Sequence, residues 1–174
     1  VGGGIKSVDD ARALLRAGAD KIAINTAATS NPKLITDLSK EFGKQCVVVS
    51  IPSKINEKKN WFVHTNGGRE KTKLDVFEWA QKVVSLGAGE LLVTSIDKDG
   101  SREGFDLNLM KGMNLINQIP IIVSGGLGNS SHVRDLLKIS NCDAIACADY
   151  LHMKRGNILE IKNMIIKSKF KARK

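Results

Sequence analysis

Cysteine and aromatic residues are scarce in this chain, and each shortage argues against a class of protein. The 174 residues include three cysteines without a C-x-x-C pair. Neither a disulfide framework nor a zinc site is therefore expected, and a reducing, cytoplasmic setting is favoured. Aromatic residues make up 5%, too few for an obvious platform on which bases could stack. The three histidines lack the spacing of metal ligands, so we predict no metal.

Long apolar runs are missing as well. None could cross a bilayer, and no signal peptide is visible before the first glycine cluster. The formal net charge of +9 would suit nucleic acid, a membrane surface or a phosphorylated metabolite. Much of the excess lies at the C-terminus, at Lys167, Lys169, Lys171, Arg173 and Lys174. We therefore predict a phosphorylated small molecule as ligand, with no nucleic-acid or membrane partner.

Short apolar runs alternate with stretches of helical period along the whole chain. Strands buried on both faces are predicted at residues 21–25, 46–51, 91–96, 119–124 and 144–148. Helices are predicted at residues 9–17, 31–42, 76–86, 108–116, 132–139 and 159–167. This alternation indicates right-handed βαβ units and a parallel sheet. Residues 61–65 and 69–73 flank Asn66-Gly67-Gly68, which predicts a hairpin lying as an excursion on top of the sheet.

An internal repeat indicates which parallel fold this is. Residues 1–5, VGGGI, match residues 123–127, VSGGL, and residues 20–23, DKIA, match residues 143–146, DAIA. One strand–turn–helix–strand unit thus recurs after two intervening βα units. A flavodoxin-like sheet gives no reason for such a period, whereas a barrel of two similar halves does. We expect an α/β fold, a (β/α)₈ barrel that is N-terminally truncated. It would be a single domain over residues 1–174, running from the end of the third strand through the eighth unit.

Two glycine turns carry the clearest chemical signal. Gly3-Gly4 and Gly125-Gly126 each follow a strand and precede a helix, where the catalytic loops of a barrel lie. Glycine allows the close backbone approach that an anion needs, although it also serves plain tight turns. Because the two turns occupy equivalent positions of a repeat, we favour two phosphate sites, one in each half.

Other polar residues follow the strands at the same edge. Asn25-Thr26 offers an amide and a hydroxyl beside the first turn, and could equally cap a helix. At the equivalent place the second copy has Ala148-Asp149, whose carboxylate would repel a phosphate. The segment Asp97-Lys98-Asp99-Gly100 brings a carboxylate to the edge, or is only a turn.

The combined segments resemble the cyclase subunit of imidazole glycerol phosphate synthase. They read VGGGIKSVDDARALLRAGADKIAINTAA, FGKQCVVVSI, LGAGELLVTSIDKDGSREGFD and IPIIVSGGLG. The related isomerase of the same pathway shares the repeat but fits these segments less well. The resemblance implies a (β/α)₈ barrel of the ribulose-phosphate-binding type, with no cofactor. It also implies ammonia from a glutaminase subunit, a substrate with a phosphate at each end, and imidazole glycerol phosphate as product.

The same resemblance assigns roles to particular residues. It places one phosphate at Gly3, Gly4, Asn25 and Thr26. It places the other at Asp99, Gly100, Gly125, Gly126 and Asp149, where the family usually has serine at position 149. Thr94 and Asp99 are the catalytic candidates. An ammonia gate and partner face would comprise Asp20, Lys21 and Glu90.

Two departures from the family affect the chemistry directly. The resemblance implies a catalytic pair of aspartates, and the one at the end of the first strand falls in the part of the barrel that the expected truncation leaves out. Pro52 occupies the position of a catalytic aspartate, and proline has no group that can move a proton, a role worth roughly 10²–10⁴-fold in rate. Two hypotheses follow. The chain is an ordinary cyclase in which Ser53 or a loop residue compensates, or it is an altered homologue. The altered homologue would channel ammonia to a sugar amidotransferase of surface-polysaccharide biosynthesis.

Overall fold

The computed structural model describes residues 1–116 and 118–173, so Lys174 of the basic tail lies outside the described residues. Its helices are α1 (Val8–Arg16), α2 (Thr26–Ser30), α3 (Lys33–Phe42), α4 (Val76–Leu86), α5 (Leu107–Met113), α6 (Ser131–Leu137), α7 (Asp149–His152) and α8 (Ile158–Lys167). Its strands are β1 (Ile22–Ile24), β2 (Val47–Ile55), β3 (Trp61–Thr65), β4 (Glu70–Asp75), β5 (Glu90–Ser95), β6 (Ile121–Ser124) and β7 (Ala144–Ala146).

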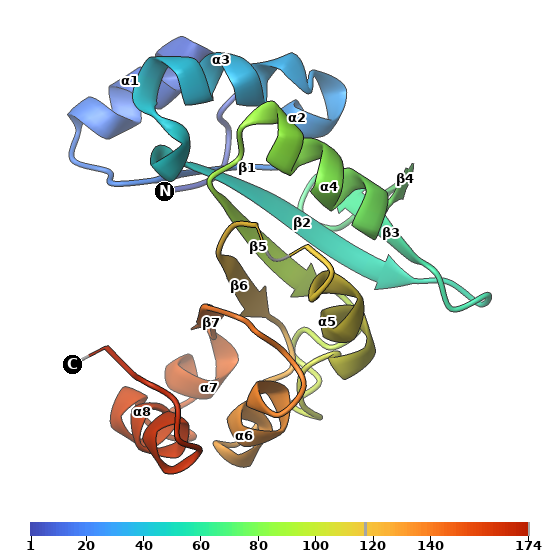
Figure 1. Ribbon diagram of the computed structural model, residues 1–174, viewed down its shortest axis with the longest axis vertical. Helices are drawn as coiled ribbons and strands as arrows, with labels where there is room; N and C mark the ends of the chain where they lie inside the picture. The colour runs from blue at the N-terminus through green and yellow to red at the C-terminus, as the bar shows by residue number, and fades with distance from the viewer. Residues whose placement is uncertain (117, 174) are drawn as a thin grey trace.

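The central sheet is parallel, as predicted. Its strands pair in the order β1–β2–β5–β6–β7, and Gly2 forms a further parallel bridge to Ala23 on the outer side of β1. Helices separate the parallel strands along the chain, so the α/β class is confirmed (Figure 1). Within the described residues, the outermost members of this sheet are Gly2 on one side and β7 on the other.

The hairpin differs from the prediction. It extends the sheet instead of lying on top of it, because β2 continues to Ile55 and its last residues pair antiparallel with β3. β1 ends at Ile24 and pairs with β2 only as far as Val49. The later part of β2 therefore has a free edge on that side, and β3, rich in aromatic and β-branched residues, supplies its partner. In Figure 1 the β3–β4 hairpin continues outward along β2.

The core lies between the sheet and the helices. Alternate residues of β1, β2, β5 and β6 are buried beneath the helices, among them Ile22, Ile24, Val47, Val49, Ile51, Leu91, Val93, Ile121 and Val123. Removing one such side chain from water contributes about 1.5–3 kcal/mol to folding. The intervening residues of β1, β2 and β5 face the opposite way and are mostly half-buried. That second face carries the site described below.

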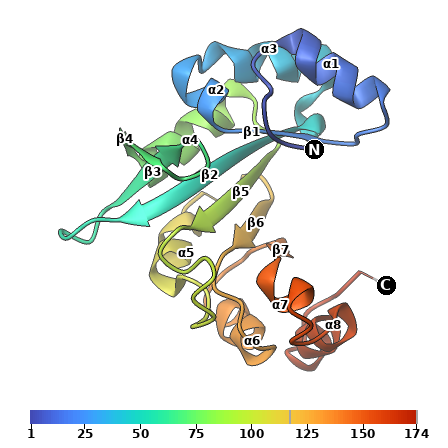
Figure 2. The same cartoon turned by 180° about the vertical axis from the view of Figure 1, so that it is seen from behind.

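The internal repeat is visible in the structure. The first copy contains α1, β1 and α2, and the second contains α6, β7 and α7. Both glycine turns have left-handed backbone angles, with φ of +103° and +73° at Gly3 and Gly4, and +96° and +103° at Gly125 and Gly126. Seen from behind, the two copies lie at opposite ends of the molecule (Figure 2). The sequence match thus reflects a repeated backbone path.

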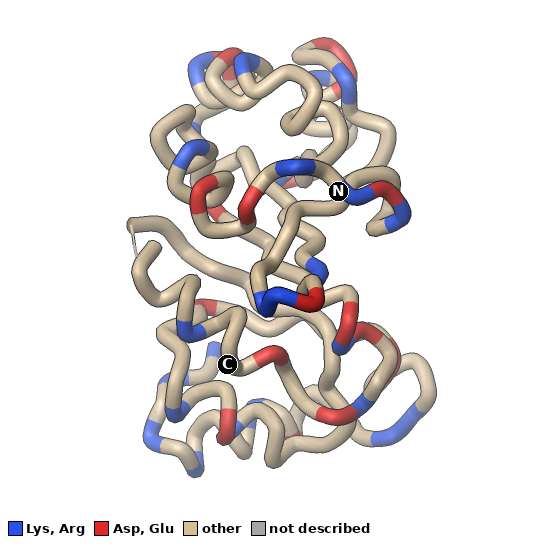
Figure 3. Tube along the Cα trace, turned by 90° about the vertical axis from the view of Figure 1, so that its right-hand side faces the viewer, with Lys and Arg blue, Asp and Glu red and all other residues tan. Residues whose placement is uncertain are grey.

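The helices are short, and the charged residues of both signs are mixed. No helix in the described part of the chain is long and apolar enough to cross a membrane. Acidic residues lie among basic ones in both halves of the trace (Figure 3). Charged residues of both signs are therefore interspersed along the chain.

Candidate phosphate-binding and reaction site

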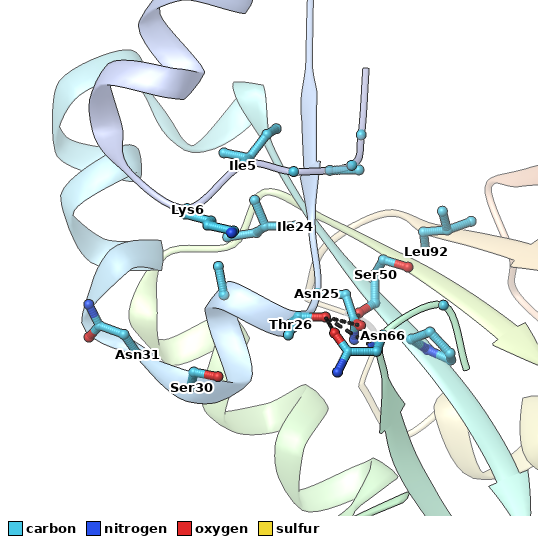
Figure 4. Close-up of a pocket in the computed structure, with 17 residues that line it drawn as sticks. Ile5, Lys6, Ile24, Asn25, Thr26, Ser30, Asn31, Ser50, Asn66 and Leu92 are labelled. Carbon is cyan, nitrogen blue, oxygen red and sulfur yellow. Dashed lines mark hydrogen bonds between the residues drawn. The ribbon is translucent and has the colours of Figure 1, made fainter. Parts of the chain in front are cut away.

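A pocket of about 800 Å³ opens where β1 ends, beside the middle of β2. It lies on the sheet face opposite the helices, at the carboxyl ends of the strands, which is where barrel enzymes bind their ligands. Its walls come from the first glycine turn, the end of β1, the middle of β2 and the hairpin tip (Figure 4). The lining residues that matter for chemistry are Gly3, Gly4, Lys6, Asn25, Thr26, Ser50, Pro52 and Asn66.

The first glycine turn is fixed by the cap of α1. Ser7 accepts a hydrogen bond from the backbone N–H of Asp10, and the Asp10 carboxylate accepts from the N–H groups of Ser7 and Lys6, each at 2.9 Å. These bonds, the one from Lys6 first, lower the pKa of the Asp10 carboxyl below its usual range. The cap therefore holds Lys6 beside the glycine turn.

Lys6 is the one charged side chain among the residues that line this pocket. Analysis of the sequence missed it, although a lysine directly between a glycine turn and a helix cap is a usable signal for an anion. We call the group Gly3, Gly4, Lys6 and Thr26 the first anion site. Because its walls carry no carboxylate, its electrostatic character suits a phosphate.

Asn25 and Thr26 connect β1 to the hairpin. The Asn25 side-chain amide donates to the backbone carbonyls of Ser50 and His64, both at 3.1 Å. The Thr26 hydroxyl accepts from the backbone N–H of Asn66 at 3.1 Å (Figure 4). The hairpin tip therefore lies at the pocket. The sequence predicted the hairpin but not its contact with Thr26. Asn25 positions backbone, and Thr26 stands at the pocket wall.

Pro52 and Thr94 lie side by side on the pocket face of the sheet. They are register partners of β2 and β5, and Pro52 lines the pocket. Ser53 is fully buried on the helix face, and its hydroxyl donates to the carbonyl of Ile51 at 3.0 Å. Ser53 therefore does not reach the pocket, so it cannot replace a catalytic carboxylate there.

The residues assigned to a second phosphate lie away from this pocket, around the second glycine turn. The backbone N–H of Asp99 donates to Ser95, and the N–H of Gly104 donates to the carbonyl of Gly126 at 2.8 Å. The loop that follows β5, which includes Gly100, is therefore packed against Gly125 and Gly126. This arrangement brings Asp99 and the turn together, with the space above the turn occupied by the chain's own backbone.

Asp149 has partners that the sequence did not suggest. The Arg102 guanidinium donates two hydrogen bonds to its carboxylate, at 2.9 and 3.0 Å, and Arg155 adds a third at 3.2 Å. The bond from Arg102 is the main reason that the pKa of Asp149 lies below its usual range, and the same pairing raises the pKa of Arg102. The carboxylate is thus neutralised within the chain.

The three residues assigned to the gate lie at the other end of the strands. Lys21 and Glu90 form an ion pair of 2.8 Å, in which the Glu90 side chain is 12% exposed. Asp20 is exposed beside it. Lys21 precedes Asn25 by four residues and Glu90 precedes Thr94 by four, so strand geometry places the pair about 13 Å from the pocket end.

Between the ion pair and the pocket the sheet face is mostly apolar. Val48 is level with Glu90 on this face, and Ala23 and Leu92 lie at the inner wall of the pocket, with Ser50 beside Leu92. Of the residues described, no group of three His, Cys, Asp or Glu side chains is placed to hold a metal ion.

Comparison with known proteins decides the family. Residues 1–157 match the sequence model of the family described as "Histidine biosynthesis protein". The chain belongs to this family. Its relatives include "Imidazole glycerol phosphate synthase subunit HisF" of Clostridium botulinum (strain 657 / Type Ba4), 49% identical over 174 residues, which covers 99% of the chain and 69% of that protein.

Two further relatives carry the same name. The protein of Hydrogenobaculum sp. (strain Y04AAS1) is 47% identical over 93% of the chain and 64% of its own length. That of Methanococcus vannielii is 45% identical over 99% of the chain and 71% of its own length. The predicted family, barrel class and enzyme class, a cyclase of histidine biosynthesis, are confirmed.

Proposed function

We propose that this chain works as a HisF-type cyclase subunit whose first anion site holds one phosphate of its nucleotide substrate. The observation that carries the proposal is the pocket itself. Two left-handed glycines, Lys6 and the Thr26 hydroxyl meet there at the carboxyl ends of parallel strands, with no carboxylate among the lining residues. Backbone N–H groups of a glycine turn and one lysine suit a phosphate well.

The reacting part of the substrate would then lie over Pro52 and Thr94. Thr94 offers a hydroxyl that can orient the substrate by a hydrogen bond, and Asp99 in the loop after β5 is the other residue assigned to catalysis. Pro52 offers no proton acceptor where ring closure needs one. Cyclisation by this chain is therefore expected to be slow compared with a barrel that has aspartate at this position.

Ammonia would reach the pocket from the opposite face. A glutaminase subunit would dock near exposed Asp20, and ammonia would pass the Lys21–Glu90 pair and follow the mostly apolar face that includes Ala23, Val48 and Leu92. The subunit names of the relatives support a complex of this kind. The ion pair itself supports a gate, because breaking and re-forming one partly exposed pair costs little.

A second candidate function is delivery of ammonia to a sugar amidotransferase in surface-polysaccharide biosynthesis. The observation that favours it is the contrast between the two ends of the sheet. The gate pair is intact, whereas the pocket has no carboxylate at position 52. Product analysis separates the two candidates, since the cyclase converts the nucleotide with ammonium salts and the delivery module does not.

The phosphate pocket is tested by Lys6→Gln. Loss of a charge-assisted bond should weaken binding of imidazole glycerol phosphate by about tenfold to a hundredfold, as measured by calorimetry. Lys40→Gln, on the exposed surface of α3, is the matched control and should bind as the parent does. Equal binding by the Lys6 variant and the parent would contradict the proposed site.

A further inference from the structure

The two glycine turns of the repeat have different surroundings. A Cβ atom placed on Gly3 or Gly4 would meet no other atom within 4 Å, and these residues border the open pocket. A Cβ placed on Gly125 would lie 2.7 Å from the carbonyl oxygen of Ser95, and one on Gly126 would overlap the carbonyl oxygen of Gly104. The first turn therefore faces free space, and the second faces the chain's own loop.

The polar residue that follows each repeat's second strand differs in the same sense. In the first copy Thr26 presents a neutral hydroxyl to the pocket. In the second copy Asp149 presents a carboxylate whose side chain is 28% exposed. This carboxylate already accepts two hydrogen bonds from Arg102 and one from Arg155. A bidentate carboxylate–guanidinium pair uses the same donors that a phosphate would use.

We propose that Asp149 closes the second anion site by keeping Arg102 and Arg155 occupied, so that this chain binds its substrate through one phosphate only. The second anion site is defined here as Arg102, Gly125, Gly126, Asp149 and Arg155. The inference rests on the proposed function of the first anion site. A substrate with a phosphate at each end would then be held at the first anion site alone, with its other phosphate left outside the closed site.

Charge and tethering explain why an incoming phosphate does not displace the carboxylate. A phosphate dianion approaching the two arginines would also approach Asp149 and be repelled by it. The carboxylate competes at the high effective concentration of a tethered group, whereas a free anion does not. Arg102 is further constrained by its backbone. Its φ angle is +64°, and its carbonyl packs against Gly128, just after the second glycine turn.

The closure should persist through the neutral pH range. Because the pKa of Asp149 in the folded chain is lowered by Arg102, the stabilising ion pair is fully present above the ordinary carboxyl value of about 3.9. It is lost only as the pH falls through the lower folded value. The number of phosphates bound at saturation is therefore expected to be the same between about pH 6 and pH 8.

The test is a titration of the whole chain with inorganic phosphate, followed by calorimetry and ³¹P NMR. The parent should bind one phosphate per chain, and Lys6→Gln should lose it. Asp149→Asn should bind two phosphates, because the amide releases the guanidinium of Arg102. The coupling between residues 149 and 102 is checked by the double variant Asp149→Asn with Arg102→Gln, which should bind one phosphate again. Asp135→Asn is the matched control, since Asp135 also lies in exposed ion pairs with Arg134 and Lys138.

The outcomes separate this inference from the proposed function. Two phosphates on the parent, unchanged in Asp149→Asn, would overturn the closure. No phosphate on the parent, with one gained in Asp149→Asn, would contradict the first anion site and support the closure. Asp149→Ser is the second variant if circular dichroism shows that the asparagine variant is unfolded. A sugar bisphosphate should bind the parent no more tightly than its monophosphate, and about tenfold more tightly in either open variant.

Discussion

At the scale of single residues, Asn25 shows how a side chain placed beside a ligand site can serve the fold. Its amide joins the end of β1 to the backbone of β2 and β3 through two hydrogen bonds. β1 pairs with β2 only as far as Val49, so the Asn25 amide supplies a donor to the Ser50 carbonyl just beyond that pairing and to the His64 carbonyl of β3. The resemblance assigns Asn25 to a phosphate, and in the structure its side-chain amide fixes the pocket wall.

We expect Asn25→Ala to lower the free energy of unfolding by about 1–3 kcal/mol, because two half-buried carbonyls lose their donors at about 1 kcal/mol each. Urea denaturation monitored by circular dichroism measures the change. Asn108→Ala, on the exposed side of α5, is the control and should shift stability little. A stability equal to that of the parent would mean that the two hydrogen bonds do not hold the hairpin.

Residue identities near the site were predictable in part. The repeat identified Gly3, Gly4 and the place of Thr26, because identical backbone turns need the same glycines. Analysis of the sequence could not pair Asp149 with Arg102, since the two are 47 residues apart and meet only after two loops pack together. Local patterns carry no information about such a contact.

At the scale of secondary structure, the cap of α1 controls the first anion site. Ser7 and Asp10 form a reciprocal capping box immediately after the glycine turn. The helix can begin at Val8 only if the chain turns there, and this turn sets the direction of Lys6. Helix stability and phosphate binding are therefore coupled at this position.

Ser7→Ala should reduce the free energy of unfolding by about 1 kcal/mol and weaken phosphate binding as well. Ser85→Ala, near the end of α4, provides the control, because its hydroxyl bonds only to a nearby helix carbonyl. Urea denaturation and phosphate titration on the same samples give both quantities. A loss of stability with unchanged affinity would show that the cap does not position the site.

Element prediction succeeded where the apolar pattern was long and failed at free edges. The parallel strands and most helices follow their predicted ranges closely, since buried runs leave little choice of structure. The extension of β2 through Pro52 to Ile55 was missed, because it depends on β3 lying beside it. The predicted helix over 31–42 begins at Lys33, after the separate short helix α2.

At the scale of the whole molecule, the sheet has two functional ends. Its carboxyl end carries the pocket, and its amino end carries the Lys21–Glu90 pair, with a mostly apolar face between them. The resemblance places a catalytic aspartate at position 52, where this chain has proline, and the ion pair proposed as the gate is formed. Both candidate functions use ammonia, which we propose enters past this pair.

Lys21→Ala should therefore impair the use of glutamine-derived ammonia more than the use of added ammonium, because only the former depends on the proposed gate. Coupled assays with a glutaminase subunit measure both rates. Asp20→Ala should weaken binding of that subunit, measured by calorimetry. If both variants couple to glutamine as well as the parent does, the gate and docking face are assigned wrongly.

The central claim is that this chain has a cyclase-type reaction site in which position 52 limits the chemistry. The most direct test is the kcat for ammonium-dependent formation of imidazole glycerol phosphate by the parent, Pro52→Asp and Pro52→Asn. An acid–base group acts on the transition state, so the account predicts that aspartate raises kcat by about 10²–10⁴-fold with little change in KM, and that asparagine does not. A parent already as fast as the aspartate variant, with all three chains folded by circular dichroism, would contradict it.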